Sequence, residues 1–261
     1  MTRIQSMQEI TKMIKAAKAG GRVAKKLFGE SLKVTTKESL NDFRTKADTG
    51  SEVAILEILK KEFPDFGIYS EEIGYLRKES EYDFIVDPLD GSYNFVIGIP
   101  DFSISIALRK NKEVIAAVVY LPILNYVYRA EKGKGAFLNN KKILVNKEDD
   151  IKKSTVVYAF DYKFSRNLAN EIEGKIWKAG VNRMINNWSP AASCCLLASG
   201  KIEAVIFSKI HLHDFCAGKL IAKEADALVT DFKGNKEKKD ENNEFIASNG
   251  FIHRKLLNIF K

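Results

Sequence analysis

Apolar and polar positions near the start of the chain follow the spacing of two helices. Over residues 6–28, apolar side chains recur every three or four positions, as on one face of an α-helix, with a Gly-Gly pair as a weak point. Residues 33–46 are polar and without a period, which indicates a loop. A second helix is expected over about residues 49–63, ended by Pro64, with an inward face made of Val53, Ile55, Leu56, Ile58 and Leu59.

The middle of the chain has the pattern of neighbouring strands. Residues 66–69 and 82–86 are short β-prone segments, and residues 102–108 alternate between apolar and polar side chains. Residues 114–121 and 126–130 follow as further strands. Because the connections between these later segments are short, the sequence predicts an antiparallel sheet.

After about residue 147, strands and helices alternate. The expected strands are 155–160, 181–185, 204–208, 228–231 and 244–248, and the expected helices are 165–178, 191–199, 214–225 and one at the end of the chain. Such alternation predicts helices over both faces of a sheet. We therefore expect an α+β fold with two halves, an α+β half over residues 1–146 and an α/β half over residues 147–261.

The composition is that of a globular protein without a membrane segment. The 261 residues are 45% hydrophobic and 29% charged, and no apolar run approaches the roughly 20 residues that span a bilayer. The first residues also lack the apolar core of a secretion signal. Cys194, Cys195 and Cys216 show no Cys-x-x-Cys spacing, so neither a disulfide framework nor a zinc site is indicated. We expect a cytoplasmic protein with no membrane partner.

The charge balance suggests an anionic partner. Lysine and arginine number 42 against 34 aspartates and glutamates, which gives a formal net charge of +8. Such a balance suits either nucleic acid or a phosphorylated metabolite. The densest charged stretch, residues 236–240, mixes both signs and is typical of a solvated loop. Nucleic acid is therefore the less favoured partner.

The strongest chemical signal follows the strand expected at residues 82–86. Asp87 and Asp90 lie three residues apart around Pro88, in a segment that is expected to turn. Such a turn can direct both carboxylates and the Leu89 carbonyl to one point. Oxygen ligands of this kind are those that Mg²⁺ prefers.

The next two residues, Gly91 and Ser92, offer backbone N–H groups at the start of a new segment. Such groups are placed to bind a phosphate. Taken alone, however, the motif is also explained by an ordinary Asp-Gly turn.

Three further acids are candidates for the same site. Glu71 follows the strand expected at residues 66–69, and Asp48 and Asp214 each stand near the start of an expected helix. Taken singly, each is explained by a surface position or a helix cap. Their order and spacing relative to Asp87 favour the functional interpretation.

Two other signals are weaker. His211 and His213 could lie on one face of a strand and bind zinc, but no third ligand has matching spacing. A hydrogen-bonded structural pair is therefore favoured. The segment Gly133-Lys134-Gly135-Ala136 lacks the full pattern of a phosphate loop, which indicates a turn between strands.

These motifs resemble those of the inositol monophosphatase family of metal-dependent phosphatases, which includes archaeal inositol monophosphatase/fructose-1,6-bisphosphatases. The resemblance covers nearly the whole chain. It implies a layered α-β-α-β-α sandwich, two or three bound Mg²⁺ ions with Mn²⁺ as a substitute, and a homodimer. The residues that carry it are Glu71-Glu72, the segment from Asp87 to Phe95, the segment from Asp214 to Ala225, and Lys37, Asp42, Thr45 and Asp48 in the loop before the second helix.

The resemblance also implies a role for each site residue. The implied metal ligands are all oxygen donors, namely Glu71, Asp87, the Leu89 carbonyl, Asp90 and Asp214. Ser92, supported by Asp48, would orient and deprotonate the attacking water, and Glu71 counts as a further catalytic residue. The expected substrate contacts are Gly91, Ser92, Asp90, Asp214 and Arg183.

The substrate side departs from the family pattern. His213 replaces a tryptophan, Asp226-Ala227 replaces a Gly-Gly pair, and Phe207 stands where animal-type members have a glutamate that touches inositol. An apolar ring cannot accept hydrogen bonds from a polyol, so strict specificity for inositol is not expected. The residues that could instead meet a second phosphate are Arg183, Lys201 and Lys209, although each alone is explained as ordinary surface charge.

We therefore expect a Mg²⁺-dependent phosphomonoesterase that acts on a small phosphorylated metabolite, either inositol 1-phosphate, fructose 1,6-bisphosphate or both. The implied mechanism is direct in-line attack of a metal-activated water, without a covalent phosphoenzyme. The alternatives are a phosphatase of 3′-phosphoadenosine 5′-phosphate and a nucleic-acid-associated binding protein.

Overall fold

The computed structural model describes residues 3–30, 35–36, 43–77, 80–161, 163–186, 189–237 and 239–260. Lys37 and Asp42 lie outside these residues. Within the expected loop, two short strands, β1 (Thr35–Thr36) and β2 (Phe43–Arg44), pair in antiparallel fashion. In the described part of the chain, no helix has both the length and the apolar character needed to cross a membrane.

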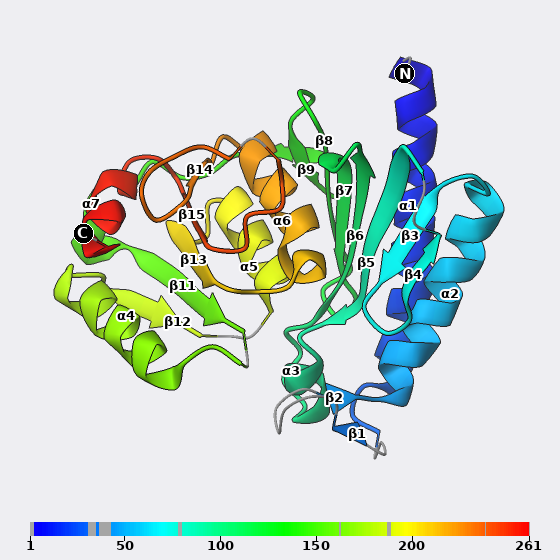
Figure 1. The fold of residues 1–261 in the computed structure, drawn as a ribbon, viewed down its shortest axis with the longest axis horizontal. Coiled ribbons are helices and arrows are strands. Elements are labelled where there is room, and N and C mark those ends of the chain that lie inside the picture. The colour runs from blue at the N-terminus through cyan, green and yellow to red at the C-terminus, as the bar shows by residue number, and fades with distance from the viewer. Residues whose placement is uncertain are drawn as a thin grey trace.

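Two long helices form the N-terminal layer. They are α1 (Arg3–Leu27) and α2 (Lys46–Glu62), which lie side by side (Figure 1). The Gly20-Gly21 pair, expected to be a weak point, lies within a continuous helix. The missing side chain of Gly20 allows α1 to pack closely against α2. A Cβ at Gly20 would lie 2.5 Å from Ser51 Oγ in α2. The prediction that Val53 faces inward was wrong, since the exposed fraction of its side chain is 66%. Residues two apart on a helix point to nearly opposite sides, and Ile55 faces the core.

The larger sheet has eight strands in the order β10-β9-β8-β7-β6-β5-β3-β4. Neighbouring strands are antiparallel as predicted, except that β3 and β5 are parallel. The strands are β3 (Gly67–Ser70), β4 (Gly74–Arg77), β5 (Tyr82–Asp90), β6 (Ser103–Lys110), β7 (Glu113–Leu121), β8 (Tyr126–Glu131), β9 (Ala136–Leu138) and β10 (Lys141–Ile143). The Gly-containing segment 133–136 is a turn that leads into β9, as expected.

The smaller sheet has five strands in the order β12-β11-β13-β15-β14. β11 is parallel to β12 and β13, whereas β15 is antiparallel to both β13 and β14. The strands are β11 (Thr155–Phe160), β12 (Arg183–Ile185), β13 (Ala204–Ser208), β14 (Leu228–Thr230) and β15 (Phe245–Ser248). The remaining helices are α3 (Ser92–Val96), α4 (Arg166–Lys178), α5 (Pro190–Ala198), α6 (Leu212–Glu224), α7 (His253–Leu257) and the short 3₁₀ helices η1 (Ile151–Lys153) and η2 (Asn258–Phe260).

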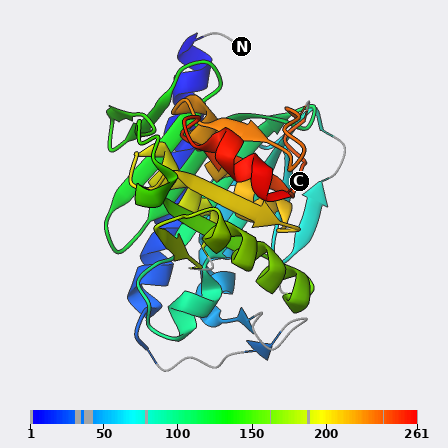
Figure 2. The same cartoon turned by 90° about the vertical axis from the view of Figure 1, so that its left-hand side faces the viewer.

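The helices and sheets stack as five layers, which confirms the predicted α-β-α-β-α sandwich. In Figure 1, α1 and α2 cover one face of the larger sheet, and α5 and α6 lie between the two sheets. Figure 2 shows α4 and α7 in front of the smaller sheet, over its outer face. The expected boundary between residues 146 and 147 falls in the connection from β10 to η1. The central core nevertheless joins residues of both halves, such as Ile85 of β5 and Phe215 of α6.

Candidate active site

Asp87 and Asp90 stand at the end of β5, where a bulge turns the strand. Asp87 pairs with Ser105 of β6 and Asp90 with Ser103, so two residues of β5 bulge out between them. Pro88 suits this bulge because it has no N–H to donate to a neighbouring strand. The Leu89 N–H donates to Asp87 Oδ1 at 2.9 Å. Both carboxylates are almost completely buried.

The two oxygens of Asp90 have different surroundings. Oδ2 accepts hydrogen bonds from Ser103 Oγ and Ser189 Oγ, both at 2.8 Å, and from the Ala192 N–H at 3.3 Å. Oδ1 is buried, and no hydrogen-bond donor among the described residues reaches it. Burial raises the pKa of Asp90 to about 8. An acceptor in this position requires either a proton or a cation.

Glu71 and Asp214 are brought to the same region by β3 and α6. The Glu71 N–H donates to the Val86 carbonyl of β5 at 3.1 Å, so its side chain starts beside the strand that carries Asp87. Asp214 is the third residue of α6, and its Oδ2 accepts from the His211 N–H at 2.9 Å. The helix-cap interpretation therefore holds for one oxygen of Asp214.

The charges of these four acids affect one another's pKa values. Burial is the largest cause that raises the pKa of Asp87, and the negative charges of Glu71, Asp90 and Asp214 raise it further. Burial and the charge of Glu71 raise the pKa of Asp214 to about 7. Chain segments far apart in the sequence thus place four carboxylates within electrostatic reach of one another.

The four acids do not form a preformed metal site. Over the ranges that the structure describes, no group of three or more His, Cys, Asp or Glu side chains is close enough to hold a metal. The donors still fit a hard divalent cation. All are oxygens, their charges repel one another, and Asp90 Oδ1 is a buried acceptor without a donor.

Asp48 and Ser92 form a second part of the site. Asp48 is fully buried in the first turn of α2, where its Oδ2 accepts from the N–H of Thr45 at 2.7 Å and from its hydroxyl at 2.6 Å. Its Oδ1 lies 2.7 Å from Ser92 Oγ, which is also 2.8 Å from the Leu89 carbonyl. Asp48 therefore caps the helix with one oxygen and holds the Ser92 hydroxyl with the other.

Gly91 determines how the chain leaves the bulge. It has a φ of +86°, in the left-handed region that favours glycine, and a Cβ there would lie 2.9 Å from the Asp101 carbonyl. Ser92 follows as the first residue of α3. The Ser92 N–H therefore stands at the start of the helix, where no preceding helical turn offers a carbonyl to accept from it.

His211 and His213 form a stack beside Asp214, as a structural pair would. Their rings are 5.3 Å apart and nearly parallel, and the His213 ring also stacks on Tyr69 at 6.0 Å. His211 Nε2 lies 2.9 Å from Asp161 Oδ2, and this contact raises the pKa of His211 to about 9.

Sequence reasoning missed Asp161, Ser103 and Ser189. Asp161 follows the end of β11, and an acid directly after a predicted strand was the available signal, as it was for Asp87. Ser103 and Ser189 had no local signal, because their importance comes from the contact with Asp90.

The three basic residues considered for contact with a second phosphate lie in different parts of the structure. Arg183 begins β12 opposite Thr155, at the amino end of the parallel strands, whereas Asp161 follows the carboxyl end of β11. Lys201 follows the far end of α5, whose first turn contacts Asp90. Lys209 follows β13 beside Asp161, and its Nζ lies 3.0 Å from Glu244.

The structure shows where two residues that depart from the family pattern, Phe207 and Asp226, lie. Phe207 is completely buried, with its ring 5.3 Å from that of Phe245, so it belongs to the core and is shielded from any ligand. Asp226, which stands in place of a glycine, adopts a φ of +69°. Aspartate tolerates this left-handed conformation better than most residues, so the turn after α6 is kept.

Comparison with known proteins shows similarity to one family over nearly the whole chain. The sequence pattern of the inositol monophosphatase family matches residues 6–261. A protein of Aquifex aeolicus named fructose-1,6-bisphosphatase/inositol-1-monophosphatase is 34% identical over 234 residues, covering 88% of this chain and 87% of its own. The protein named Nus factor SuhB from Pasteurella multocida is 35% identical over 227 residues, covering 84% and 83%. Among solved structures, a Thermotoga maritima inositol monophosphatase has a TM-score of 0.88 at 30% identity, covering 97% and 96%.

Proposed function

Because the chain belongs to the inositol monophosphatase family and is thereby a phosphoric monoester hydrolase, we propose that it hydrolyses a sugar or polyol phosphate in a reaction that needs Mg²⁺. The observation that carries this proposal is the convergence of four mutually repelling carboxylates beside the Asp48–Ser92 pair. Repulsion of this kind weakens the fold unless it serves to hold a cation.

The proposed cation ligands are Glu71, Asp87, the Leu89 carbonyl, Asp90 and Asp214. When bound, Mg²⁺ would lower the pKa of a coordinated water and neutralise charge on the phosphate ester. The protein contributes oxygens held on fixed elements, of which those of Asp87 and Asp90 are buried. Asp90 in particular is held by two serine hydroxyls and a backbone N–H, which orient its free oxygen.

Asp48 and Ser92 are proposed to handle the proton of the attacking water. The buried Asp48 carboxylate fixes the Ser92 hydroxyl, which can turn its lone pairs to a water near the phosphate. The backbone N–H groups of Gly91 and Ser92 would bind phosphoryl oxygens as negative charge develops on them. Water attacks phosphorus directly in this scheme, and no covalent phosphoenzyme forms.

Two observations bear on the substrate. Phe207 is buried and cannot bind a polyol, which speaks against recognition of inositol by that position. Lys209 and His211 stand beside Asp161 near Asp214 and form a polar rim, in which Lys209 is paired with Glu244 and His211 with Asp161. A sugar that carries a second phosphate, such as fructose 1,6-bisphosphate, fits this rim, and Lys209 is therefore a better candidate than Arg183 for contact with it.

The deciding experiment measures phosphate release from a small panel of esters, with Mg²⁺ or Mn²⁺ and with EDTA. The panel contains inositol 1-phosphate, fructose 1,6-bisphosphate, glycerol phosphate and 3′-phosphoadenosine 5′-phosphate. We expect turnover of one or both of the first two, and none in EDTA. Preference for the adenosine compound would move the protein to the alternative substrate class. No turnover of any ester above the EDTA control would refute the proposal.

The nucleic-acid alternative needs a separate measurement, because several relatives carry the name Nus factor SuhB and the net charge is +8. Binding to RNA and DNA is followed as a function of salt. Affinity that falls steeply with salt, in a protein without phosphatase activity, would support this alternative. The family also motivates a cytoplasmic homodimer, which sedimentation of the purified protein and fractionation of cells would test.

A further inference from the structure

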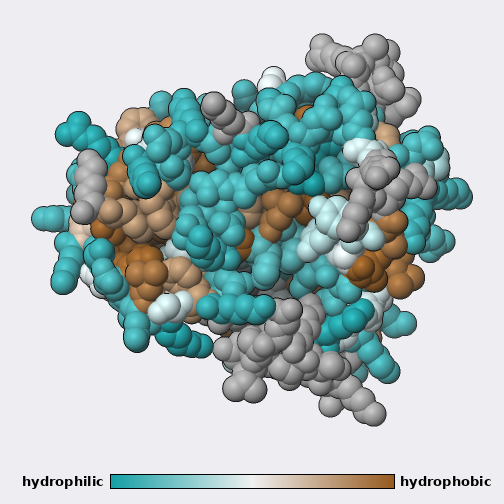
Figure 3. Space-filling view, in the orientation of Figure 1, coloured by the Kyte–Doolittle hydropathy of each residue, from teal (hydrophilic) through white to brown (hydrophobic). Residues whose placement is uncertain are grey.

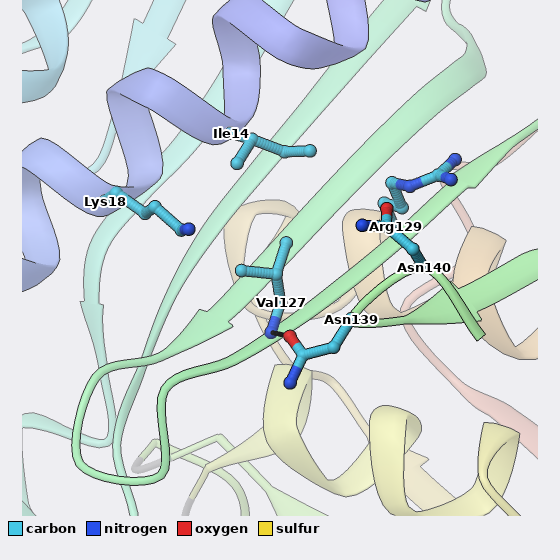
Figure 4. A pocket seen from close by; sticks show the side chains of 6 residues that line it. All are labelled: Ile14, Lys18, Val127, Arg129, Asn139 and Asn140. Carbon is cyan, nitrogen blue, oxygen red and sulfur yellow. Dashed lines mark hydrogen bonds between the residues drawn. The ribbon is translucent and has the colours of Figure 1, made fainter.

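We propose that a cavity on the α1 side of the larger sheet is a second anion-binding site, which takes the phosphate group of a small molecule. The cavity has a volume of about 160 Å³ and lies between α1, β8 and the turn from β9 to β10 (Figure 4). Its lining residues are Ile14, Lys18, Val127, Arg129, Asn139 and Asn140. The inference is independent of the proposed function.

The lining has the chemistry of an oxyanion site. Lys18 and Arg129 are both half-buried, and no acidic side chain lines the cavity. Within the described ranges, neither of these two cations has a carboxylate at ion-pair distance. Glu131, the next residue on this face of β8, is paired with Lys134 at 2.8 Å. Two cations that share a cavity repel each other, and an anion between them would remove that repulsion.

The Arg129 side chain is held in place by an aromatic ring. Its guanidinium lies over the ring of Phe137 at 4.3 Å from the ring centre. Stacking of this kind restricts the side chain without using its N–H donors, which stay available for phosphate oxygens. The flexible Lys18 ammonium and the side-chain amide of Asn140 provide further donors.

The cavity wall is fixed before any ligand arrives. Asn139 and Asn140 form the tight turn between β9 and β10, with φ angles of +44° and +69°. Asn139 Oδ1 accepts from the Val127 N–H at 2.9 Å, as the dashed line in Figure 4 shows, and so ties the turn to β8. On the opposite side, Ile14 and Lys18 are one helical turn apart on α1 (Figure 4). A preformed cavity loses little ordering entropy when a ligand binds.

The cavity is separate from the carboxylate group. Val127 belongs to the core under α1 and α2, and Arg129 points to the same face because it lies two residues further along the strand. Ile85 belongs to the core under α5 and α6, so Asp87 starts from that opposite face. In addition, β8 lies three strands away from β5, a separation of about 14 Å across a sheet.

The volume limits the ligand to a small one. Water occupies about 30 Å³ per molecule in the liquid, so the cavity has room for about five waters. That space accommodates a phosphate and a few carbon atoms. The methyl groups of Ile14 and Val127 would contact the carbon part.

The test uses inorganic phosphate as the probe, with the full chain in EDTA so that no divalent cation occupies the carboxylate group. Binding is followed by calorimetry up to about 10 mM, where a millimolar site fills. The double variant Lys18→Gln/Arg129→Gln should lose about tenfold or more in phosphate affinity. Lys25→Gln, an exposed cation on the same helix, is the matched control and should bind like the natural chain.

Comparison of anions identifies the ligand class. Glycerol phosphate that binds with the same dependence on the two cations indicates a phosphomonoester, and binding of inorganic phosphate alone indicates the free ion; both support the site. Acetate binding of equal strength, phosphate binding unchanged in the double variant, or no phosphate binding by the natural chain would each overturn it. Circular dichroism of both variants confirms that they are folded.

Discussion

Asp90 shows, at the scale of one residue, how a carboxylate can be both anchored and available. Three donors hold Oδ2, while Oδ1 is buried without one. A buried acceptor that lacks a partner costs about 1–3 kcal/mol. The cost is recovered when a proton or a cation occupies the position, so the residue is unfavourable alone and well suited as a ligand.

The first prediction concerns Asp87→Asn. This change removes one negative charge from the centre of the repelling group, and we expect phosphatase activity to fall by about 10³-fold or more, because oriented charge supplies much of the catalysis. The fold should remain, with unchanged or raised thermal stability in EDTA. Asp65→Asn, at an exposed position, is the control and should keep full activity. Near-normal turnover of Asp87→Asn would contradict the site.

The second prediction separates the hydroxyl of Ser92 from its packing. Ser92→Ala removes the group that Asp48 holds, and a loss of about 10²-fold in kcat with little change in KM is expected. Ser92→Thr keeps a hydroxyl and should retain most of the activity. Equal losses in the two variants would show that the hydroxyl has no role in proton transfer.

At this scale the sequence was informative where chemistry and local spacing coincide. Asp87 and Asp90 stood out because a proline and a glycine next to two acids form a distinctive turn. Ser189 gave no signal, since its contact with Asp90 joins residues 99 positions apart. For the same reason, no pattern predicted that Lys18 and Arg129 would line one cavity.

Among the elements, α7 is attached to the smaller sheet by a buried histidine. His253 Nδ1 lies 2.8 Å from Ser248 Oγ of β15, and its Nε2 lies 2.9 Å from Thr230 Oγ1 of β14. Burial lowers the pKa of His253 to about 4. The ring is therefore neutral in the folded protein over a range where an exposed histidine is charged.

The third prediction follows from that pKa. Between about pH 6.5 and pH 4 the unfolded chain takes up a proton that the folded chain does not, so the free energy of unfolding should fall as the pH falls through this range. The full contribution of the group is about 3 kcal/mol. Denaturant unfolding of the natural chain and of His253→Gln at pH 7 and pH 4.5 measures it. The variant should lose less stability over this interval, and parallel losses would rule the histidine out.

Element boundaries were predictable where polar residues stand on both ends of an apolar segment. The strands at residues 155–160 and 204–208 were predicted to the residue, since flanking polar residues delimit them. The alternation expected for residues 102–108 does not correspond to a solvated face, because helices cover both sides of the larger sheet and residues 103–109 are all buried. The short strands β4, β9 and β10, which lie at or next to the edges of the larger sheet, were missed, because so few residues contain too little pattern to recognise.

The whole molecule combines a hydrophilic surface with a group of four acids, of which Asp87 and Asp90 are buried. Figure 3 shows a face that is mostly hydrophilic, with apolar residues in patches toward its left-hand and right-hand sides. The layered arrangement itself came from the resemblance to a family. Periodicity alone gives the elements but not their order in a sheet, since strand pairing depends on contacts distant in sequence.

The fourth prediction links cation binding to overall stability. Asp90 and Asp214, with pKa values of about 8 and 7, keep protons in the folded chain that the unfolded chain releases above about pH 4. Without metal, their contribution to stability therefore decreases as the pH rises from about 4 to 8.

Mg²⁺ competes with those protons, so it should stabilise the protein more at pH 8 than at pH 5. At a concentration about 100 times its dissociation constant, the gain should approach roughly 3 kcal/mol. Denaturant unfolding with Mg²⁺ and with EDTA at both pH values measures the effect. A gain that does not depend on pH would mean that the ion binds elsewhere.

The position of α5 and α6 between the two sheets limits how the chain can be divided. In this layer the two helices are in close contact, since a Cβ at Gly218 of α6 would lie only 3.0 Å from the Ala191 carbonyl of α5. A cut between β10 and η1 would leave one fragment with an uncovered sheet and Asp87, and the other with bare helices and Asp214. Neither piece would hold a working centre. Mixed together, they should restore hydrolysis only by reassembling as a complementing pair.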